Sequence, residues 1–432
     1  MPTKQGKGDI QMNMTQEVRF RKRVLWRYAA AGMAMCSVIW GYSPAEAMWV
    51  GQSQINPFVQ VEGQYESNIF QTYSDEESDF VTIISPGVHV EYPTAEGAKM
   101  KLTADYRADI RLYGNDGDSE IDPDGELNTV DHRLGANLLF GMASGIEVEA
   151  GYALNLTSVA PSSKGDKRDP YTEHDLSASI AYRFVDVYKI ELGYNGMFRG
   201  FDDAEDEVDD ITDHGVSLIG LYQLSPMLAV LVGGDYGTID RKAPFVDSKQ
   251  YKAYGGFEYD VTGQTTGRLK LGLVGRKFDS SEIMPIGVAS GSYKIDDPSD
   301  FYAEGVLESK YMERSSLTVR LFREYHDTSF TEETSENGVY YMSTGVEGKL
   351  SHSVASLPNL SLLAHASFSK DTYPDDTDDR DDSTFEVGAG FDYSLYKFIT
   401  LGAGYTYISA DSNINENDYD DQLASVRIRG LL

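Results

Sequence analysis

Apolar and polar side chains alternate without interruption along KMKLTADYRADIRLY, residues 99–113. Every second residue from Met100 to Leu112 is apolar or aromatic, and the residues between them are polar or charged. A period of two places alternate side chains on opposite faces of a β-strand, whereas a helical period of 3.6 would spread these charges around the whole circumference. The stretch is therefore predicted to be a long strand with one apolar face and one charged face.

The length of this strand indicates what its apolar face touches. Strands of soluble proteins are usually about 5–6 residues long, and this alternation continues for roughly 15. A strand tilted by about 45° needs about 9–11 residues to cross the hydrocarbon layer. Every backbone group in lipid must be paired, so spanning strands occur in closed barrels. A strand of a large soluble β-sandwich or propeller is the competing interpretation of this stretch taken alone.

The rest of the chain repeats the pattern and favours the barrel. Strands are expected near residues 58–70, 80–92, 99–113, 129–140, 146–156, 173–184, 189–201, 214–224, 228–239, 250–261, 267–278, 300–311, 316–326, 339–350, 360–372, 384–395, 399–409 and 422–432. Long connections alternate with short ones, as outer-membrane barrels require. We therefore predict an all-β, transmembrane antiparallel outer-membrane β-barrel of about 18 strands (range 16–20), with short periplasmic turns and longer acidic extracellular loops.

A barrel of this size leaves an aqueous channel. The longest connection, Asp279–Ser299, is the candidate to fold into that lumen.

Residues 1–47 are typical of a cleaved signal peptide. A basic segment, Arg19–Arg27, precedes a short apolar segment, Tyr28–Tyr42, and the A-x-A sequence Ala45–Ala47 follows. The expected domains are the signal peptide over 1–47 and a single transmembrane barrel over 48–432. Export through the general secretory pathway to a Gram-negative outer membrane follows from this arrangement. The only cysteine, Cys36, lies in the leader, so no disulfide or cysteine metal site is expected in the mature chain.

The acidic composition restricts the possible partners. A net charge of −32 makes nucleic acid an unsuitable partner, because phosphate binding needs the opposite sign. Acidic clusters fall in expected loops, for example Asp116–Glu126, and are either solvated surface or bridged by divalent cations to lipopolysaccharide. The spacing in that loop does not fit a calcium-binding loop. The expected partners are outer-membrane lipid, lipopolysaccharide and, during biogenesis, the barrel-assembly machinery.

Three acidic-histidine pairs open descending strands: Asp131-His132, Glu173-His174 and Asp213-His214. Equivalent positions two strands apart are separated by about 9.6 Å, which is too far for one metal ion bound at about 2.1 Å. They are interpreted as residues of the membrane interface. The chain has no G-x-S-x-G or H-E-x-x-H sequence, so no catalytic site, enzyme activity, metal or cofactor is expected.

The charged face of the strands supplies the candidate functional residues, because rings of charge set the selectivity of a pore. The lumen-lining candidates are Asp105, Arg107, Asp109, Arg111, Arg133, Glu147, Glu149, Arg183, Glu191, Arg268, Lys270, Arg320, Glu324, Arg427 and Arg429. Both signs are interleaved, so no strong ion preference is predicted. The alternative role of these residues is to form cross-strand ion pairs that hold the barrel together.

The beginning of the mature chain resembles a known family. Asn68-Ile69-Phe70, Ser78-Asp79 and a strand containing Pro86-Gly87 match the signature of the putative β-barrel porin 2 family of Gram-negative outer-membrane proteins. Members are often associated with exopolysaccharide synthesis and export. The resemblance implies a conduit for sugar polymer, served by a periplasmic polysaccharide-export protein. A general diffusion porin for small solutes and a non-transporting structural or surface-display barrel are the alternatives.

Overall fold

The structure is a computed structural model of the 432-residue chain. It describes residues 48–432 apart from short segments. Those segments are 94–98, 119–120, 123–124, 126, 143–144, 160–167, 186, 204–206, 243–244, 261–263, 281, 284–292, 295–296, 313, 329–338 and 375–378. The expected signal peptide therefore lies outside the described residues. No helix in the described ranges is long and apolar enough to cross a membrane.

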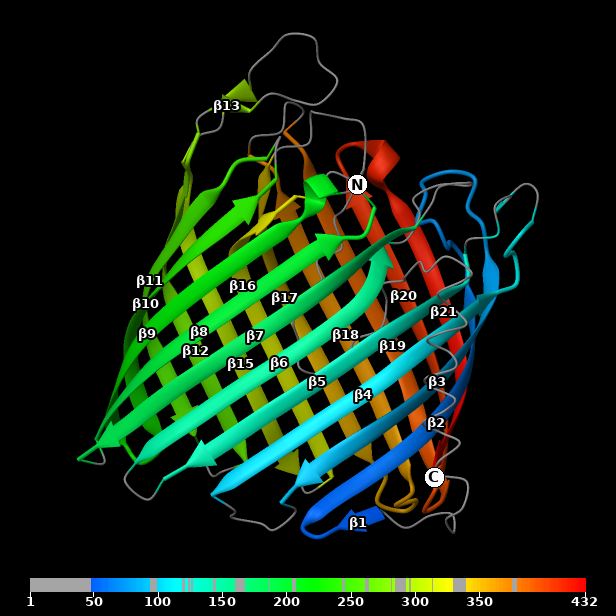
Figure 1. Cartoon of the computed structure of the whole chain (residues 1–432), viewed down its shortest axis with the longest axis horizontal. Helices are drawn as coiled ribbons and strands as arrows, with labels where there is room; N and C mark the ends of the chain where they lie inside the picture. Colours follow the sequence, from blue (N-terminus) through cyan, green and yellow to red (C-terminus); the bar gives the residue numbers. More distant parts are fainter. Residues whose placement is uncertain are drawn as a thin grey trace.

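Within the described chain, eighteen long strands form one antiparallel sheet that closes into a barrel (Figure 1). They are β2 (Ser53–Glu66), β3 (Asp79–Tyr92), β4 (Met100–Tyr113), β5 (Thr129–Gly141), β6 (Ile146–Val159), β7 (Asp169–Phe184), β8 (Tyr188–Phe201), β9 (Ile211–Ser225), β10 (Leu228–Arg241), β11 (Ser248–Asp260), β12 (Thr265–Phe278), β15 (Ser299–Met312), β16 (Ser315–Asp327), β17 (Tyr340–Ser353), β18 (Leu360–Thr372), β19 (Asp381–Tyr396), β20 (Ile399–Ser412) and β21 (Tyr419–Leu431). Each pairs with the next in this order, and β2 pairs with β21 to close the ring.

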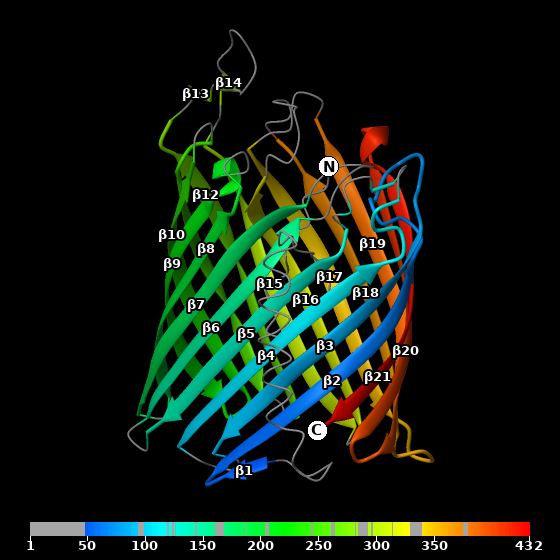
Figure 2. The ribbon, with the colours of Figure 1, turned by 45° about the vertical axis from the view of Figure 1, so that its right-hand side comes forward.

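Three short strands and two 3-10 turns complete the described elements. They are β1 (Met48–Val50), which pairs with β2, the paired strands β13 (Glu282–Ile283) and β14 (Tyr293–Lys294), and the 3-10 turns η1 (Glu207–Asp209) and η2 (Asn415–Asn417). The β13–β14 hairpin projects beyond the rim of the barrel (Figure 2). The described part of the loop that was expected to enter the lumen thus stands away from it. The remainder of that loop lies outside the described residues.

The predicted fold class is confirmed, and the alternating stretch over 99–113 forms β4. The prediction of a first strand over 58–70 is wrong, because β2 ends at Glu66. Beyond it Asn68 builds a turn, in which its side-chain Oδ1 accepts a hydrogen bond from the Thr72 backbone N at 3.1 Å. Gln71 has a φ of 54°, which ends the extended conformation. The apolar residues of Asn68-Ile69-Phe70 therefore belong to a loop.

The charged face of each strand is the inner one. On β4, Leu112 is 43% exposed while its neighbour Arg111 is 2% exposed. Arg268 of β12 lies 3.4 Å from Glu191 of β8, four strands away around the ring. Strands are spaced by about 4.8 Å, so side chains can bridge four of them only across the concave side of the wall.

The outer face carries an apolar band with aromatic edges. Tyr182, Phe184, Tyr188 and Tyr222 stack in a row near the short-turn end, with successive ring centroids 5.3–5.8 Å apart. His174 and Phe184 are ten residues apart on β7. A residue of a strand tilted by about 45° adds about 2.3 Å along the barrel axis, so the two side chains are separated by roughly 23 Å in that direction. This separation is close to the height of about 25 Å expected for a lipid-facing band.

The three repeated histidines share one arrangement on this outer face. Each ring nitrogen Nδ1 lies 2.9 Å from a tyrosine hydroxyl of the preceding strand. The pairs are Tyr106–His132, Tyr152–His174 and Tyr194–His214. Their partners are aromatic hydroxyls on the membrane side, which agrees with an interfacial position.

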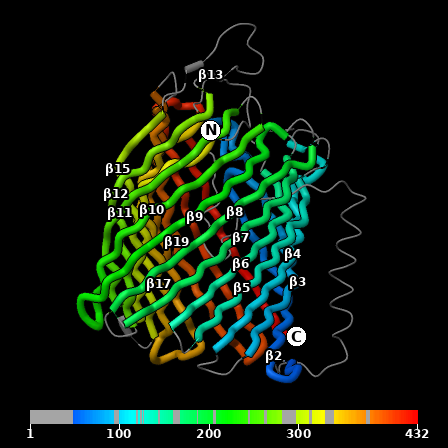
Figure 3. Tube along the Cα trace, turned by 60° about the vertical axis from the view of Figure 1, so that its left-hand side comes forward, coloured from blue at the N-terminus to red at the C-terminus, as the bar shows by residue number. Residues whose placement is uncertain are grey.

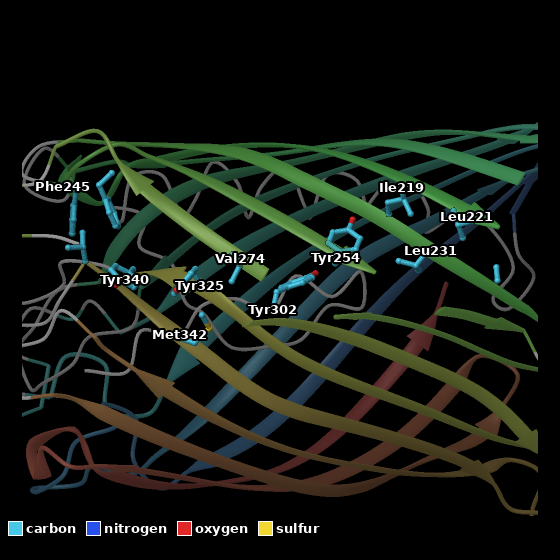
Figure 4. Close-up of a cluster of buried hydrophobic side chains, with 13 residues drawn as sticks. Ile219, Leu221, Leu231, Phe245, Tyr254, Val274, Tyr302, Tyr325, Tyr340 and Met342 are labelled. Carbon is cyan, nitrogen blue, oxygen red and sulfur yellow. The ribbon is translucent and has the colours of Figure 1, made fainter. Parts of the chain in front are cut away.

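One side of the barrel is filled by apolar side chains. The inner faces of β9 to β12 and β15 contribute a buried cluster that also includes Tyr325 of β16, Tyr340 and Met342 of β17, and Phe245 in the loop before β11 (Figure 4). Tyr302, Val274 and Leu231 in this cluster are at most 1% exposed. In the ring, β10 to β12 lie on the other side from β2, which pairs with β21 (Figure 3).

Candidate functional site: the inner wall of the barrel

The inner face of β4 carries alternating charges that are linked by hydrogen bonds. Arg107 Nε donates to Asp109 Oδ1 at 2.5 Å, and Arg107 Nη2 donates to Ser85 Oγ at 3.2 Å. The Ser85 hydroxyl in turn donates to Asp109 Oδ1 at 2.5 Å. The Arg111 guanidinium lies 3.4 Å from a carboxylate oxygen of Asp131 on β5. Alternation along one strand thus becomes a network that spans β3, β4 and β5.

All of the charged residues proposed from the sequence occupy inner-face positions in the strand register. Most of them form ion pairs. The pairs are Glu147 with Lys189 (3.1 Å), Arg268 with Glu258 (2.5 Å) and with Glu191 (3.4 Å), Lys270 with Glu304 (3.0 Å), Arg320 with Glu324 (3.1 Å), and Arg427 with Asp392 (2.8 Å). Asp105 is hydrogen-bonded to the ring nitrogen Nδ1 of His89 at 2.5 Å. These charges largely cancel one another, and their pairing also ties the strands together.

Four of the candidates form no side-chain ion pair with another described residue. They are Arg133, Arg183, Arg429 and Glu149. Arg429 is exposed, and its guanidinium carbon lies over the ring of Phe58 at 4.0 Å from the centroid. Arg133 stands directly opposite Arg107 in the β4–β5 register. The unpaired cations Arg133 and Arg429 thus lie on either side of the β2–β3 wall.

Two arcs of the inner wall are rich in short side chains, and the second also contains the pair of His365 and Glu386, 3.1 Å apart. Cross-strand register places glycine, alanine, serine and asparagine next to one another on β5 to β8, and glycine, serine and threonine on β18 to β21. The first arc contains Gly135, Asn137, Gly151, Ala153, Ser177, Ser179, Gly193 and Asn195; the second contains Ser367, Ser369, Thr384, Gly388, Gly390, Gly404, Thr406 and Ser425. A Cβ added at Gly135 would meet no atom within 4 Å, so this part of the wall adjoins open space.

A buried ionic cluster closes the filled side of the barrel near the long loops. Arg276 of β12 donates from Nη2 to Asp327 of β16, and the Arg241 guanidinium lies 3.7 Å from the same carboxylate oxygen. Arg241 also lies 3.7 Å from Asp209 in η1. The Phe245 ring lies under the Arg241 guanidinium at 3.8 Å. These contacts connect β10, β12 and β16 to η1 and to the loop that contains Phe245.

Loops fold over the inner wall at the mouth near β3 and β4. Ile69 and Phe70 are buried against the inward-facing Val81 and Ile83, together with Tyr113 and Leu127. Asn68 fixes this loop to the closing strand, since its backbone N donates to Asp421 Oδ1 at 3.1 Å. The family signature Asn68-Ile69-Phe70 therefore lies in a loop that packs on the inner wall at the barrel mouth and is hydrogen-bonded to β21.

The other signature residues shape β3. Asp79 accepts hydrogen bonds from the backbone N of Phe80 at 2.6 Å and of Asn115 at 3.0 Å, and Ser78 O accepts one from the Asn115 amide at 3.1 Å. The β3–β4 ladder is interrupted at Ser85-Pro86, where proline lacks an N–H. At Gly87 an added Cβ would lie 2.4 Å from Phe58 Cζ, so only glycine leaves room for that ring.

Several residues of the wall were missed by sequence reasoning. Glu173 accepts two hydrogen bonds from Arg199, at 2.8 and 2.5 Å, and Asp392 binds Arg427. Strict application of the two-residue period would have found these residues, because each lies on the charged face of its strand. The position of Phe58 next to Arg429 could not have been found in this way, since it depends on the register of the closing pair.

The acidic loops use part of their charge internally. Asp116 accepts hydrogen bonds from the backbone N of Asn128 at 3.1 Å and from its side chain at 2.6 Å. Hydrogen bonds to Asp210 and Glu207 raise the pKa of Lys242 above its usual value. No group of three potential metal ligands occurs in the ranges that the structure describes. Bridging of these loops to lipopolysaccharide stays a prediction.

A closed antiparallel barrel with an apolar exterior and a charged interior defines a porin-like channel of the outer membrane. The comparison of the sequence with protein families gives the same answer. The model of the family described as putative beta-barrel porin 2 matches residues 44–430, and the chain belongs to this family. The expected family is thereby confirmed. Fold and family favour a channel over an enzyme.

Comparison with solved structures finds other outer-membrane porins. OpdK of Pseudomonas aeruginosa, solved with vanillate, has a TM-score of 0.45 and 11% identity, covering 88% of this chain and 99% of its own. A BenF-like porin of Pseudomonas fluorescens Pf-5 has a TM-score of 0.44 and 12% identity, covering 89% and 100%. No protein of curated function matches the sequence.

Proposed function

We propose that this channel carries carbohydrate across the outer membrane, with export of an exopolysaccharide as its specific role. The observation that supports the cargo is the pair of short-side-chain arcs on β5 to β8 and β18 to β21. Hydroxyl and amide groups, with the backbone beside glycine, can exchange hydrogen bonds with sugar hydroxyls and their hydration water. Short side chains also leave width for a hydrated chain.

The pairing of charges elsewhere on the wall supports the same cargo. An isolated ring of one sign would select small ions, whereas ion pairs such as Arg320–Glu324 present little net field to a polymer. In this proposal the short-turn end faces the periplasm and receives the polymer from a periplasmic polysaccharide-export protein. Outer-membrane lipid and lipopolysaccharide surround the apolar band.

Conductance of the purified barrel in planar bilayers tests the proposal. We expect discrete steps with weak ion preference, and blockades by neutral oligosaccharides that lengthen with the number of sugar units. Ser177→Phe would narrow the first arc and lower the conductance. Ala178→Phe adds the same ring to the adjacent residue of β7, which faces outward, and is expected to leave conductance unchanged.

Two outcomes would contradict the carbohydrate cargo. A folded protein without conductance steps supports the display-barrel alternative. Conductance with free entry of small sugars into liposomes, but without length-dependent blockades, supports the general diffusion porin.

A further inference from the structure

We propose that Arg429, Arg107 and Arg133 form a binding station for an oxyanion, the carboxylate or phosphate group of a solute in the lumen. These three arginines come from β21, β4 and β5, on both sides of β2 and β3. The inference rests on the proposed channel function and narrows its cargo to acidic carbohydrate. We call this set the arginine station.

Arg429 is held in place without a carboxylate. The Phe58 ring of β2 lies against Gly87 of β3, where an added Cβ would come within 2.4 Å of the ring. The guanidinium of Arg429, from the strand on the other side of β2, lies over this ring at 4.0 Å. A cation–π contact orients a guanidinium and leaves its N–H donors free for a planar oxyanion.

The surroundings of Arg429 are predominantly cationic. Arg107 and Arg427 act on it as like charges, and the single carboxylate acting on it is Asp392. That carboxylate is already engaged, because Arg427 donates to it from both Nε at 3.2 Å and Nη2 at 2.8 Å. Arg429 is therefore left with positive potential and exposed donors.

Arg107 and Arg133 provide an independent observation. They are directly opposite in the β4–β5 register, and like charges in this position destabilise a sheet. Asp109 offsets the charge of Arg107, while Arg133 has no ion-pair partner among the described residues. An anion bound between the station residues would remove the repulsion.

The nearby carboxylates of the inner wall are committed to other groups. Glu62 accepts a hydrogen bond from Gln60 at 3.0 Å, and Asp105 is hydrogen-bonded to the ring nitrogen Nδ1 of His89 at 2.5 Å. Asp131 lies 3.4 Å from Arg111 and accepts a bond from Thr157 at 3.2 Å. Asp131 also interacts electrostatically with Arg133, whereas none of the carboxylates named here contacts Arg429.

The shape of guanidinium determines the ligand class. Its fork of N–H groups matches the two oxygens of a carboxylate or phosphate, and it binds them in a bidentate way. A uronic acid unit or a phosphorylated sugar of a polymer would thus pause at the arginine station. The two short-side-chain arcs would carry its neutral neighbours.

Current blockade in planar bilayers tests the arginine station. Glucuronate, inorganic phosphate and neutral glucose are compared as blockers of the folded channel, which separates a sugar carboxylate from free phosphate. We expect glucuronate to bind at least about tenfold more tightly than glucose, since hydrogen bonds to charged groups are the strong ones. Arg429→Gln and Arg133→Gln should each weaken glucuronate binding by about tenfold.

Arg183→Gln is the matched control. Arg183 also lacks an ion pair among the described side chains, but it lies on β7 next to the short turn before β8. Its loss changes the net charge equally and should alter glucuronate binding by less than about twofold if the site is local. Arg429→Lys, which keeps the charge without the fork, should recover only part of the affinity.

The outcomes separate this inference from the channel function. Equal weakening in Arg429→Gln and Arg183→Gln would show a general charge effect and overturn the station. Conductance without preference for glucuronate over glucose would also overturn the station and leave the channel intact. Absence of conductance rejects the channel, and titration calorimetry of glucuronate in detergent then still decides the station. If Arg429→Gln does not fold, Arg133→Gln gives the same test.

Discussion

Replacement of Gly87 by alanine is predicted to destabilise the barrel. The new Cβ would lie 2.4 Å from Phe58 Cζ and 2.7 Å from the backbone oxygen of Tyr106. The ring could turn away only by leaving its contact with Arg429, and the oxygen could move only with β4. Overpacking costs typically about 1–3 kcal/mol, and we expect about 2–3 kcal/mol here because a backbone atom is involved.

Gly135→Ala is the matched control on β5. No atom lies within 4 Å of the added Cβ, and glycine to alanine reduces the freedom of the unfolded chain. This change is expected to stabilise by about 0.4–1 kcal/mol. The two variants should therefore differ by about 3 kcal/mol in the free energy of unfolding.

Urea unfolding in lipid vesicles, followed by the gel mobility of the folded barrel, measures this difference. Adding Phe58→Ala to Gly87→Ala removes the ring contact and leaves the contact with Tyr106, so part of the stability should return. Coupled residues deviate from additivity by about 0.5–3 kcal/mol. Equal stability of Gly87→Ala and Gly135→Ala would refute the close packing described for this wall.

Three further predictions concern the two faces of β7, the buried cluster around Asp327 and the expected signal peptide. Ile180→Arg should cost about 2–4 kcal/mol in vesicle unfolding because it faces lipid, whereas Ser179→Arg on the inner face should be tolerated; equal costs would contradict the assigned faces. Asp327→Ala leaves Arg276 and Arg241 buried without their shared carboxylate and should cost about 3–5 kcal/mol by the same assay, and a neutral result would disprove that dependence. N-terminal sequencing of the outer-membrane fraction should begin at Met48; retained leader residues would show that the expected cleavage does not occur.

The sequence predicted most of the wall because alternation carries both strand position and face. The run from Met100 to Tyr113 differs from its predicted bounds by one residue, and the charges between its apolar residues lie on the inner face. Alternation failed near Asn68, because Ile69 and Phe70 are apolar for a reason unrelated to a strand. They pack under a folded loop, and only the tertiary structure shows what they cover.

The filled side of the barrel could not be predicted for a similar reason. Leu221, Leu231 and Val274 look like ordinary strand residues, and nothing in the chain indicates that they meet inside the barrel. Their contacts depend on the curvature of the wall between β9 and β17. Cross-strand ion pairing was one of the two roles predicted for the charged residues. The partner of each charge could not be predicted, because it depends on the register between neighbouring strands.

The closing pair of β2 and β21 has a consequence for assembly. Phe58 and Arg429 belong to strands whose paired residues are about 370 positions apart, and joining such distant ends costs about 5 kcal/mol in chain entropy. An arc of strands that has not yet joined exposes two unpaired edges and lacks the contact between these side chains. Phe58 and Arg429 can therefore meet only when the last edge is sealed, and their contact is a marker of the completed ring.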